Sequence, residues 1–500
     1  MSGRAEQGLP QWRLLMLTVA MCGVQICYAV QIGHGTPQLE VLGMGTQYVS
    51  LAWLAGPLSG LIMQPLIGVL SDRCVSPLGK RRPFLIIGCV LSSLALIMFS
   101  NAAQLGRACA TALGGSLTAW SIFFGIMGFF FLDFSVNAIQ GPLRALLTDV
   151  TPEAQQATGN AYFAFMVGLG NLLGSYLGSL DFRSMGWTFF QENIQILFFL
   201  AMLLLDLTIV LCVVFTSEAP NRVAEQANRR EQIDIDEKAR LLGEGNMNDE
   251  HVLGDRETEH SFEEDDVEFD DLGSTLSIVM YEAPVPYWQV FAVQFCAWFG
   301  FFSIMVYAVD WVALNVFRGV SSAPRGTTER MLYEKGVRVG NIGLSMCALV
   351  TIVYAAALPK LVRRLGLRQV YFISQAVEGI GLCLPLFLRG SPGVMPSLGL
   401  QIAAVSTIGL MGIFMASAMT IPWSLMGVAV QRMYPDKVGV FSALFNACQA
   451  GPQLIVALIS PLILRVAADV SVIMFMGGMS AFLGAYLVLH HGIGVDEFYQ

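Results

Sequence analysis

The apolar residues of this 500-residue chain arrive in blocks of about twenty, the length that an α-helix needs to cross the hydrocarbon core of a bilayer. Only 13% of the residues are charged, whereas water-soluble proteins carry about a quarter, so a soluble fold of this size would lack polar surface. We count six blocks, a long polar stretch and six more, at Trp12–Gly33, Tyr48–Leu70, Phe84–Ser100, Leu117–Gln140, Gly159–Leu180, Ile194–Phe215, Tyr287–Asp310, Gly340–Leu358, Gln369–Leu388, Leu398–Met419, Gly439–Leu464 and Val470–His490.

This pattern predicts an all-α polytopic membrane protein with twelve transmembrane helices in two six-helix halves. No small-residue cleavage site follows the first block, which we interpret as a retained span that also directs insertion. The expected parts are a cytoplasmic N-terminus over 1–11, an N-terminal half over 12–216, a cytoplasmic loop over 217–285, a C-terminal half over 286–490 and a cytoplasmic C-terminus over 491–500.

The net charge of −9 comes from one segment of the chain. Residues 217–285 hold 20 acidic and 6 basic residues, while the remainder holds 17 acidic and 22 basic. Such a charged segment, with little apolar surface to bury, predicts a disordered linker, with a regulatory or partner-binding role as the alternative. With the N-terminus inside, the short inner segments hold 13 Lys and Arg residues and the outer ones 9, a mild bias that places both ends in the cytoplasm.

A short basic turn follows the second span of each half. The first contains Gly68–Arg73 and Gly79–Arg82, and the second contains Lys360–Arg368. The first resembles the signature loop of major facilitator transporters, G-x-x-x-D-R-x-G-R-R, with extra residues before the glycine, and this implies the major facilitator fold. An ordinary basic anchor at the inner interface is the alternative. We predict a conformational latch, opening and closing as the halves rock, made by Asp72, Arg73, Lys80, Arg81 and Arg82.

Asp133 is the clearest candidate for a functional charge because it lies deep inside the fourth apolar block. An ionisable side chain within the hydrocarbon region is costly and rare. A carboxyl group in a poorly hydrated cavity is suited to taking up and releasing a proton. We therefore predict that Asp133 binds a coupled proton, with a structural hydrogen bond to a neighbouring helix as the alternative.

Other polar residues extend the stripe that Asp133 begins. Asn137, four residues on, shares its helix face. Arg144, eleven residues on, returns to within about 20° of that face after a rise of about 16 Å, too far to touch Asp133. Gly141-Pro142 is expected to loosen the helix between them. Asp310 ends the seventh block and is a weaker candidate of the same kind, with a packing role as the alternative. The predicted proton-coupling residues are Asp133, Arg144 and Asp310.

Amide and aromatic side chains recur at helical spacing in several blocks. Gln25, Tyr28 and Gln31 stand at i, i+3 and i+6, and Asn446 and Gln449 stand at i and i+3. Such stripes predict a polar central cavity, since amides bind sugar hydroxyls and aromatic faces pack on sugar rings; interhelical hydrogen bonding alone is the alternative. The predicted substrate-binding residues are Gln25, Tyr28, Gln31, Trp53, Gln64, Asn137, Gln140, Asn446 and Gln449.

Two stretches of the first half resemble the plant sucrose/proton symporters and their animal and fungal relatives, within the glycoside–pentoside–hexuronide family. They run from Gly23 to Phe84 and from Leu132 to Asp149. The resemblance implies sugar/proton symport, with a protonatable acid at Asp133 and a substrate-linked arginine at Arg144. Around the seventh span Asp310 is kept, but one acid and an Arg-Glu pair of the plant pattern are absent, so coupling or sugar choice is expected to differ.

The leading expectation is a proton-coupled symporter of sucrose or a related glucoside that works by alternating access. The alternatives are an uncoupled sugar facilitator and a non-transporting membrane sugar sensor. The chain has no nucleophile–base constellation, metal-ligand spacing or phosphate-binding loop, so we expect no enzyme activity, cofactor, metal or nucleic-acid partner. The expected partners are a small sugar, protons and the lipid bilayer, with a monomer as the default state. The expected location is the plasma membrane, with a vacuolar or lysosomal membrane as the alternative.

Overall fold

The structure is a computed structural model that describes residues 9–218, 283, 285–433, 441, 444–491 and 493. The predicted acidic linker, including the run Glu263–Asp271, lies almost entirely outside the described residues. The structure therefore does not test the regulatory role that was the alternative for this segment. Most of both predicted termini also lie outside the described residues.

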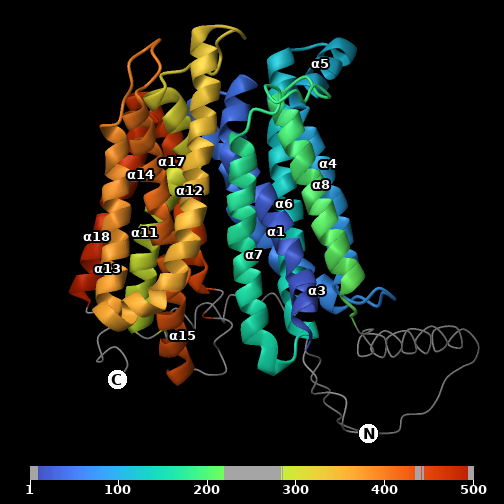
Figure 1. Cartoon of the computed structure of the whole chain (residues 1–500), viewed down its shortest axis with the longest axis vertical. Coiled ribbons are helices and arrows are strands. Elements are labelled where there is room, and N and C mark those ends of the chain that lie inside the picture. The colour runs from blue at the N-terminus through green and yellow to red at the C-terminus, as the bar shows by residue number, and fades with distance from the viewer. Residues whose placement is uncertain are drawn as a thin grey trace, which may run out of the picture.

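The N-terminal half contains six long helices and one short one (Figure 1). The second span is continuous from α2 through a 3-10 turn, η1, into α3, and α5 is the short helix. The elements are α1 (Gln11–Val41), α2 (Thr46–Val49), η1 (Ser50–Leu54), α3 (Ala55–Asp72), α4 (Arg82–Ser100), α5 (Ala102–Leu113), α6 (Leu117–Val150), α7 (Glu153–Ser179) and α8 (Asn193–Phe215).

The C-terminal half repeats the plan on the other side of the molecule (Figure 1). Its first helix, α11, ends in a π-helical turn, η2, and α13 continues into a 3-10 turn, η3. The elements are α11 (Val285–Trp311), η2 (Val312–Val316), α12 (Thr328–Leu365), α13 (Leu367–Cys383), η3 (Leu384–Leu386), α14 (Leu398–Ala418), α15 (Ile421–Met433), α17 (Ala447–Ala467) and α18 (Val470–His490).

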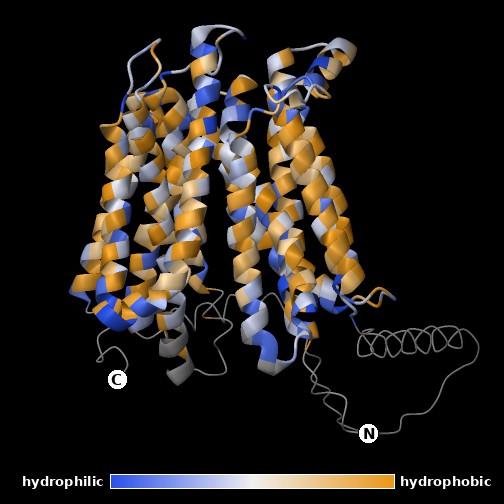
Figure 2. Ribbon diagram, viewed as in Figure 1, coloured by the Kyte–Doolittle hydropathy of each residue, from blue (hydrophilic) through white to orange (hydrophobic). Residues whose placement is uncertain are grey.

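The twelve-helix, two-half architecture predicted from the sequence is confirmed. Within the described part of the chain, 11 spans are long and apolar enough to cross a membrane. The twelfth is α13, whose 17 residues are extended by the three residues of η3. Figure 2 shows apolar residues along the helix shafts and hydrophilic residues gathered at the two ends of the bundle. We call the end where α1 begins the inner face and the end where α1 finishes the outer face.

Several helices are longer than the predicted apolar blocks. Helix α1 continues beyond Gly33 to Val41, α6 continues beyond Gln140 to Val150, and α12 begins at Thr328 rather than Gly340. These three boundaries were wrong because the added turns carry charged and polar side chains, which end an apolar block although the helix continues. Helix α6 also runs unbroken through Pro142, so the predicted loosening there does not interrupt it.

A stripe of glycines on α7 brings this helix very close to α1. A Cβ added to Gly170 would lie 2.7 Å from the Cβ of Gln25, and one added to Gly174 would lie 2.7 Å from the Cβ of Ala29. A Cβ added to Gly178 would lie 3.1 Å from Nε2 of His34 on α1. Small residues at every fourth position are a common means of close packing between membrane helices.

The two halves meet along a seam formed by α1, α7 and η1 on one side and α11, α12 and α17 on the other. Among the described residues, hydrogen bonds cross this seam towards the outer face. Ser50 Oγ donates to the Ala457 carbonyl at 2.9 Å, and Asn341 Nδ2 donates to the Gly33 carbonyl at 3.3 Å. Gly33 stands four residues before Pro37, which has no N–H to give to that carbonyl.

Candidate functional site

The carboxyl group of Asp133 is held by an amide from another helix. Asp133 lies near the middle of α6 and is 4% exposed, and its Oδ2 accepts a hydrogen bond of 2.9 Å from Nε2 of Gln31 on α1. Gln31 is 2% exposed, so the bond forms away from bulk solvent. The half-buried ring of Tyr28, one turn before Gln31, lies within electrostatic range of the same carboxyl group.

Asn137 is the centre of a second set of hydrogen bonds, directly beside Asp133. Its Nδ2 donates to the Asp133 carbonyl at 3.0 Å and to Ser59 Oγ at 2.7 Å. Its Oδ1 accepts from Nε2 of Gln64 at 3.2 Å. The structure therefore joins α1, α3 and α6 through one polar cluster, which we call the Asp133 cluster: Gln31, Ser59, Gln64, Asp133 and Asn137.

Trp53 lies on the seam rather than open to a ligand. Its Nε1 donates to Thr36 Oγ1 at 2.9 Å, and Thr36 Oγ1 donates in turn to the Val306 carbonyl of α11 at 3.1 Å. The indole ring meets Phe129 edge-on at 5.1 Å and Phe302 edge-on at 6.4 Å between ring centroids. In this conformation Trp53 helps to hold the halves together.

Arg144 is exposed, and its guanidinium carbon lies 5.3 Å from the centre of the Phe163 ring of α7. Gln25 packs against α7 at Gly170, and Gln140 is half-buried on α6. No hydrogen bond among the described residues links these side chains to Asp133.

The remaining predicted residues lie in the C-terminal half. Asn446 is exposed and Gln449 is half-buried at the start of α17, and no described hydrogen bond joins their side chains to the Asp133 cluster. Asp310 is fully buried at the end of α11, where it faces residues of the seam rather than Asp133.

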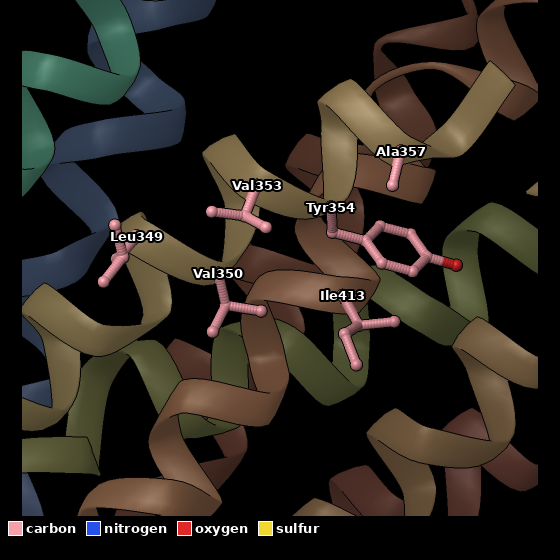
Figure 3. A pocket seen from close by; sticks show the side chains of 6 residues that line it. All are labelled: Leu349, Val350, Val353, Tyr354, Ala357 and Ile413. Carbon is pink, nitrogen blue, oxygen red and sulfur yellow. The ribbon is translucent and has the colours of Figure 1, made fainter. Parts of the chain in front are cut away.

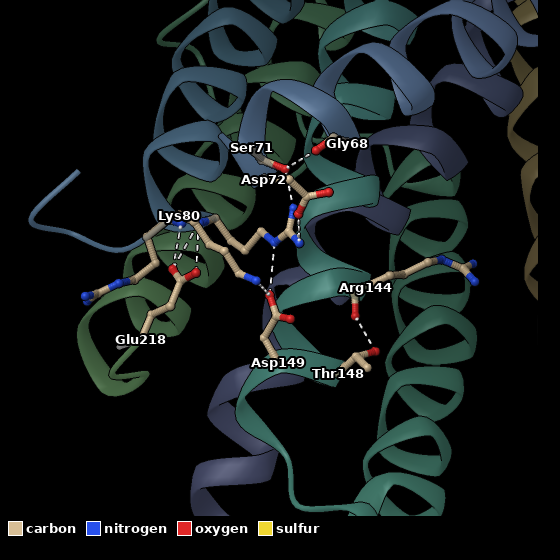
Figure 4. A network of polar contacts seen from close by, with 10 residues as sticks. Gly68, Ser71, Asp72, Lys80, Arg144, Thr148, Asp149 and Glu218 are labelled. Atoms are coloured by element: carbon tan, nitrogen blue, oxygen red, sulfur yellow. Dashed lines mark hydrogen bonds and ion pairs between the residues drawn. The ribbon is translucent and has the colours of Figure 1, made fainter. Parts of the chain in front are cut away.

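Four of the predicted latch residues, Asp72, Lys80, Arg81 and Arg82, belong to one polar network at the inner face, and Figure 4 shows Asp72 and Lys80 there with Asp149 and Glu218. The Arg81 guanidinium bonds to Ser71 and Asp72 and, through Nε, to Asp149 Oδ2 at 3.0 Å. Lys80 Nζ lies 3.1 Å from the same Asp149 oxygen. The network therefore ties the loop after α3 to the end of α6.

A further carboxylate, Glu218, completes this network from beyond α8. Its two oxygens each accept from the Arg81 backbone N–H at 3.0 Å, and one accepts from the Arg82 N–H at 3.3 Å. Arg82 Nη1 donates to the Val213 carbonyl at 3.2 Å, while Arg73 is exposed. These contacts lie within the N-terminal half.

The turn between α17 and α18 holds a second charged group, outside the spans. Asp469 Oδ1 accepts from Asn315 Nδ2 at 2.7 Å and from Ser471 Oγ at 2.7 Å, and Arg389 lies 2.5 Å from Oδ2. Partial burial acts to raise the pKa of Asp469, but the hydrogen bonds from Ser471 and Asn315 and the charge of Arg389 hold it below its usual value.

A shallow pocket of about 330 Å³ lies on α12 and α14, away from these clusters (Figure 3). Its walls are apolar apart from one phenol ring, so it offers little to a hydroxyl-rich ligand. It is lined by Leu349, Val350, Val353, Tyr354, Ala357 and Ile413.

The sequence reasoning missed several members of these clusters. Ser59 carried no signal of its own, since a single serine in an apolar block is common. Glu218 was assigned to the acidic loop, although it lies at the end of the sixth span. Glu40 and Tyr333 fell outside the predicted apolar blocks, so they were not considered as site residues. Both lie within helices that extend beyond those blocks, Glu40 in α1 and Tyr333 in α12.

Comparison with known proteins identifies the family. Residues 39–457 match the model of the Major Facilitator Superfamily. The chain belongs to the major facilitator superfamily. Two solved structures have a similar fold. The nucleoside transporter NupG has a TM-score of 0.60 and 10% identity over 96% of this chain and 99% of that one. The inward-open xylose transporter XylE from E. coli has a TM-score of 0.56 and 15% identity over 96% of this chain and 95% of that one.

Within the superfamily, the resemblance to sucrose transporters is also confirmed. The chain is 29% identical over 482 residues to the sucrose transport protein SUT2 of Oryza sativa subsp. indica, covering 91% of this chain and 87% of that protein. It is 28% identical over 466 residues to the sucrose transport protein SUC4 of Arabidopsis thaliana, covering 89% of this chain and 82% of that protein.

Proposed function

We propose that this protein carries sucrose or a related glucoside across a membrane together with protons, by alternating access. The observation that carries the proposal is the Asp133 cluster: a buried carboxyl group in the middle of a span, bonded to one amide and surrounded by others. Its relatives named as sucrose transport proteins supply the substrate class.

The chemistry of the cluster suits both tasks. A carboxyl group with a single amide donor is costly to keep ionised away from water, so it favours binding a proton when the site is closed. The amides of Gln31, Asn137 and Gln64 already form hydrogen bonds of the kind that sugar hydroxyls make. A sugar entering beside Asp133 would exchange these bonds for bonds to its own hydroxyls, which couples occupancy to the proton on Asp133.

The seam suggests which stage of the cycle the structure represents. The described hydrogen bonds between the halves lie towards the outer face, as for Ser50 with Ala457 and Asn341 with Gly33. We infer a state that is closed on the outer side. In this scheme the Arg81 network stiffens the inner end of the N-terminal half as the halves rock, which is the proposed role of the latch.

The direct test is uptake of labelled sucrose, maltose and glucose into proteoliposomes, with and without an imposed pH gradient. We expect sucrose uptake to rise with an inward proton gradient and this stimulation to disappear in Asp133→Asn. A matched control is Asp206→Asn, which changes another membrane acid, one that accepts a 2.8 Å hydrogen bond from Ser93 on the same half. Unchanged proton stimulation in Asp133→Asn would refute the role of Asp133.

The same assay separates the alternatives. Sucrose uptake that resists a protonophore would identify an uncoupled facilitator, and sucrose binding without flux would identify a sensor. We place the protein at the plasma membrane as part of the proposal, with a vacuolar or lysosomal membrane as the alternative that imaging of the tagged chain would reveal.

A further inference from the structure

A pair of buried carboxyl groups faces one tyrosine at the outer end of the seam. Glu40 lies near the end of α1 and is 3% exposed, and Asp310 near the end of α11 is 0% exposed. Tyr333, in the second turn of α12, is 1% exposed. Glu40 belongs to one half of the molecule, while Asp310 and Tyr333 belong to the other. We call Glu40 and Asp310 the outer carboxyl pair.

The tyrosine bonds to only one of the two acids. Tyr333 Oη donates to Glu40 Oε2 at 3.0 Å, with the Pro37 carbonyl at 3.5 Å. Among the described residues, Glu40 Oε1 and both Asp310 oxygens have no hydrogen-bond donor in bonding geometry. Glu40 and Asp310 lie within electrostatic range of each other. Within the described residues, Tyr333 is thus the one donor in bonding geometry with the pair, and the hydroxyls of Thr46 and Ser321 lie near Glu40 without such a bond.

The surroundings offer little positive charge to offset two carboxylates. Arg330 lies 5.8 Å from the centre of the Tyr333 ring but is ion-paired with Glu334 at 2.8 Å. Arg465 of α17 is bonded to Tyr48 at 2.7 Å. The other groups near the pair are neutral: Thr46 and Ser321 lie beside Glu40, and Tyr307 lies within electrostatic range of both acids. Ser50 and Ser460 face Tyr307.

Two carboxyl groups that share a dry site cannot both be ionised, because each charge raises the energy of the other and neither is hydrated. A proton on either acid removes this repulsion. We propose that Glu40 and Asp310 share one proton across the seam, and that this proton locks the outer gate closed.

The proposal fixes the direction of the pH effect. Opening the outer face would draw α1 away from α12, break the Tyr333–Glu40 bond and let water reach both acids. Both carboxyl groups would then ionise, releasing one proton to the outer side, and closing would take one up. The closed state binds one more proton than the open state, so rising pH favours opening. This inference uses the rocking motion of the proposed function, but it does not depend on Asp133 or on the sugar.

The test measures the outer gate directly by double electron–electron resonance. Nitroxides are attached to cysteines introduced at Arg107 and Ser391, exposed outer positions on opposite halves, after the half-buried native cysteines are changed to serine. In the labelled protein with Glu40 and Asp310 unchanged, we expect the population with the longer label distance to rise with pH. For a one-proton equilibrium the rise is up to about tenfold per pH unit.

Glu40→Gln reproduces the shape of a protonated Glu40, so the closed state no longer needs a proton. We expect its distance distribution to stay closed and to lose the pH dependence. Asp310→Asn provides a second variant of the same kind should Glu40→Gln fold poorly. Glu329→Gln is the matched control: it removes an exposed acid from the first turn of the same helix, leaves the Arg330–Glu334 ion pair in place, and should respond to pH as the unaltered protein does.

Two results would overturn the proposal of a shared proton. One is a distribution of label distances that does not change with pH while Glu40 and Asp310 are both present. The other is an unchanged pH response in both Glu40→Gln and Asp310→Asn. Asp133→Asn distinguishes this from the proposed function, because it should lose proton-driven uptake while keeping the pH response of the gate. A pH-responsive gate without sugar transport would refute the proposed function and leave the lock standing.

Discussion

Replacing Gly174 by alanine should weaken the N-terminal half, because α7 and α1 are in contact there without space for a methyl group. The added Cβ would lie 2.7 Å from Ala29 Cβ, 2.8 Å from the Ile26 carbonyl oxygen and 3.0 Å from Ile26 Cα. Two of these three neighbours are backbone atoms, which cannot turn aside as the end of a flexible side chain can. One of the two helices must therefore shift along much of its length.

The size of the effect follows from comparison with a second glycine. A Cβ at Gly60, within α3, meets nothing within 4 Å. Both substitutions gain the same preference of alanine for a helix, about 0.5–1 kcal/mol, so this term cancels in their difference. What remains is the cost of overpacking, about 1–3 kcal/mol. For a unit the size of one half this corresponds to a gap of about 2–12 °C in Tm between the two variants.

The assay is thermal unfolding of the purified protein in detergent, followed by the intrinsic fluorescence of its tryptophans. Gly174→Ala should unfold at the lower temperature and Gly60→Ala at or slightly above the temperature of the parent. If Gly174→Ala proved as stable as Gly60→Ala, the close approach of α7 to α1 would not exist in the folded protein.

Three further variants test other parts of the structure. Asp149→Asn removes the carboxylate that Arg81 and Lys80 share, and should cost about 1–3 kcal/mol of stability, seen as a lower Tm in the same unfolding assay. Asn137→Ala removes the hydrogen bonds that its side chain makes with Gln64 and Ser59, and should raise the sugar concentration for half-maximal uptake by about tenfold, measured in proteoliposomes. The lowered pKa of Asp469 means that its ionised form stabilises the folded state above about pH 4, and that this contribution disappears as pH falls through the folded pKa. Asp469→Asn should therefore lower Tm at pH 7 and reduce the dependence of Tm on pH below 4.

The sequence predicted the architecture because the bilayer imposes one requirement on every span, a run of apolar residues of fixed length. It failed at helix ends such as Thr328 of α12, because the first turns of that helix carry charged and polar side chains that no apolar block contains. Helix α5 was missed for a related reason: it is too short to span a membrane and has an amphipathic rather than a uniformly apolar sequence.

The sequence predicted several residues of the candidate site, but it did not predict which of them form hydrogen bonds with each other. A lone acid inside an apolar block identified Asp133, and helical spacing identified Gln31 and Asn137. Which amide meets which acid depends on how α1 and α6 pack, and spacing along one helix contains no information about that. The outer carboxyl pair could not be predicted because Glu40 and Asp310 lie on helices of different halves, and the sequence does not show which helices meet across the seam.

The proline in α1 has a consequence for how water moves through the protein. Because Pro37 cannot donate to the Gly33 carbonyl, that oxygen depends on Asn341 of the opposite half for its partner. In the proposed alternating-access cycle the halves part, and this oxygen then needs another donor, which lipid cannot supply. Water is the donor that could replace Asn341 there, so the proposed opening and the hydration of this level of the pathway are coupled.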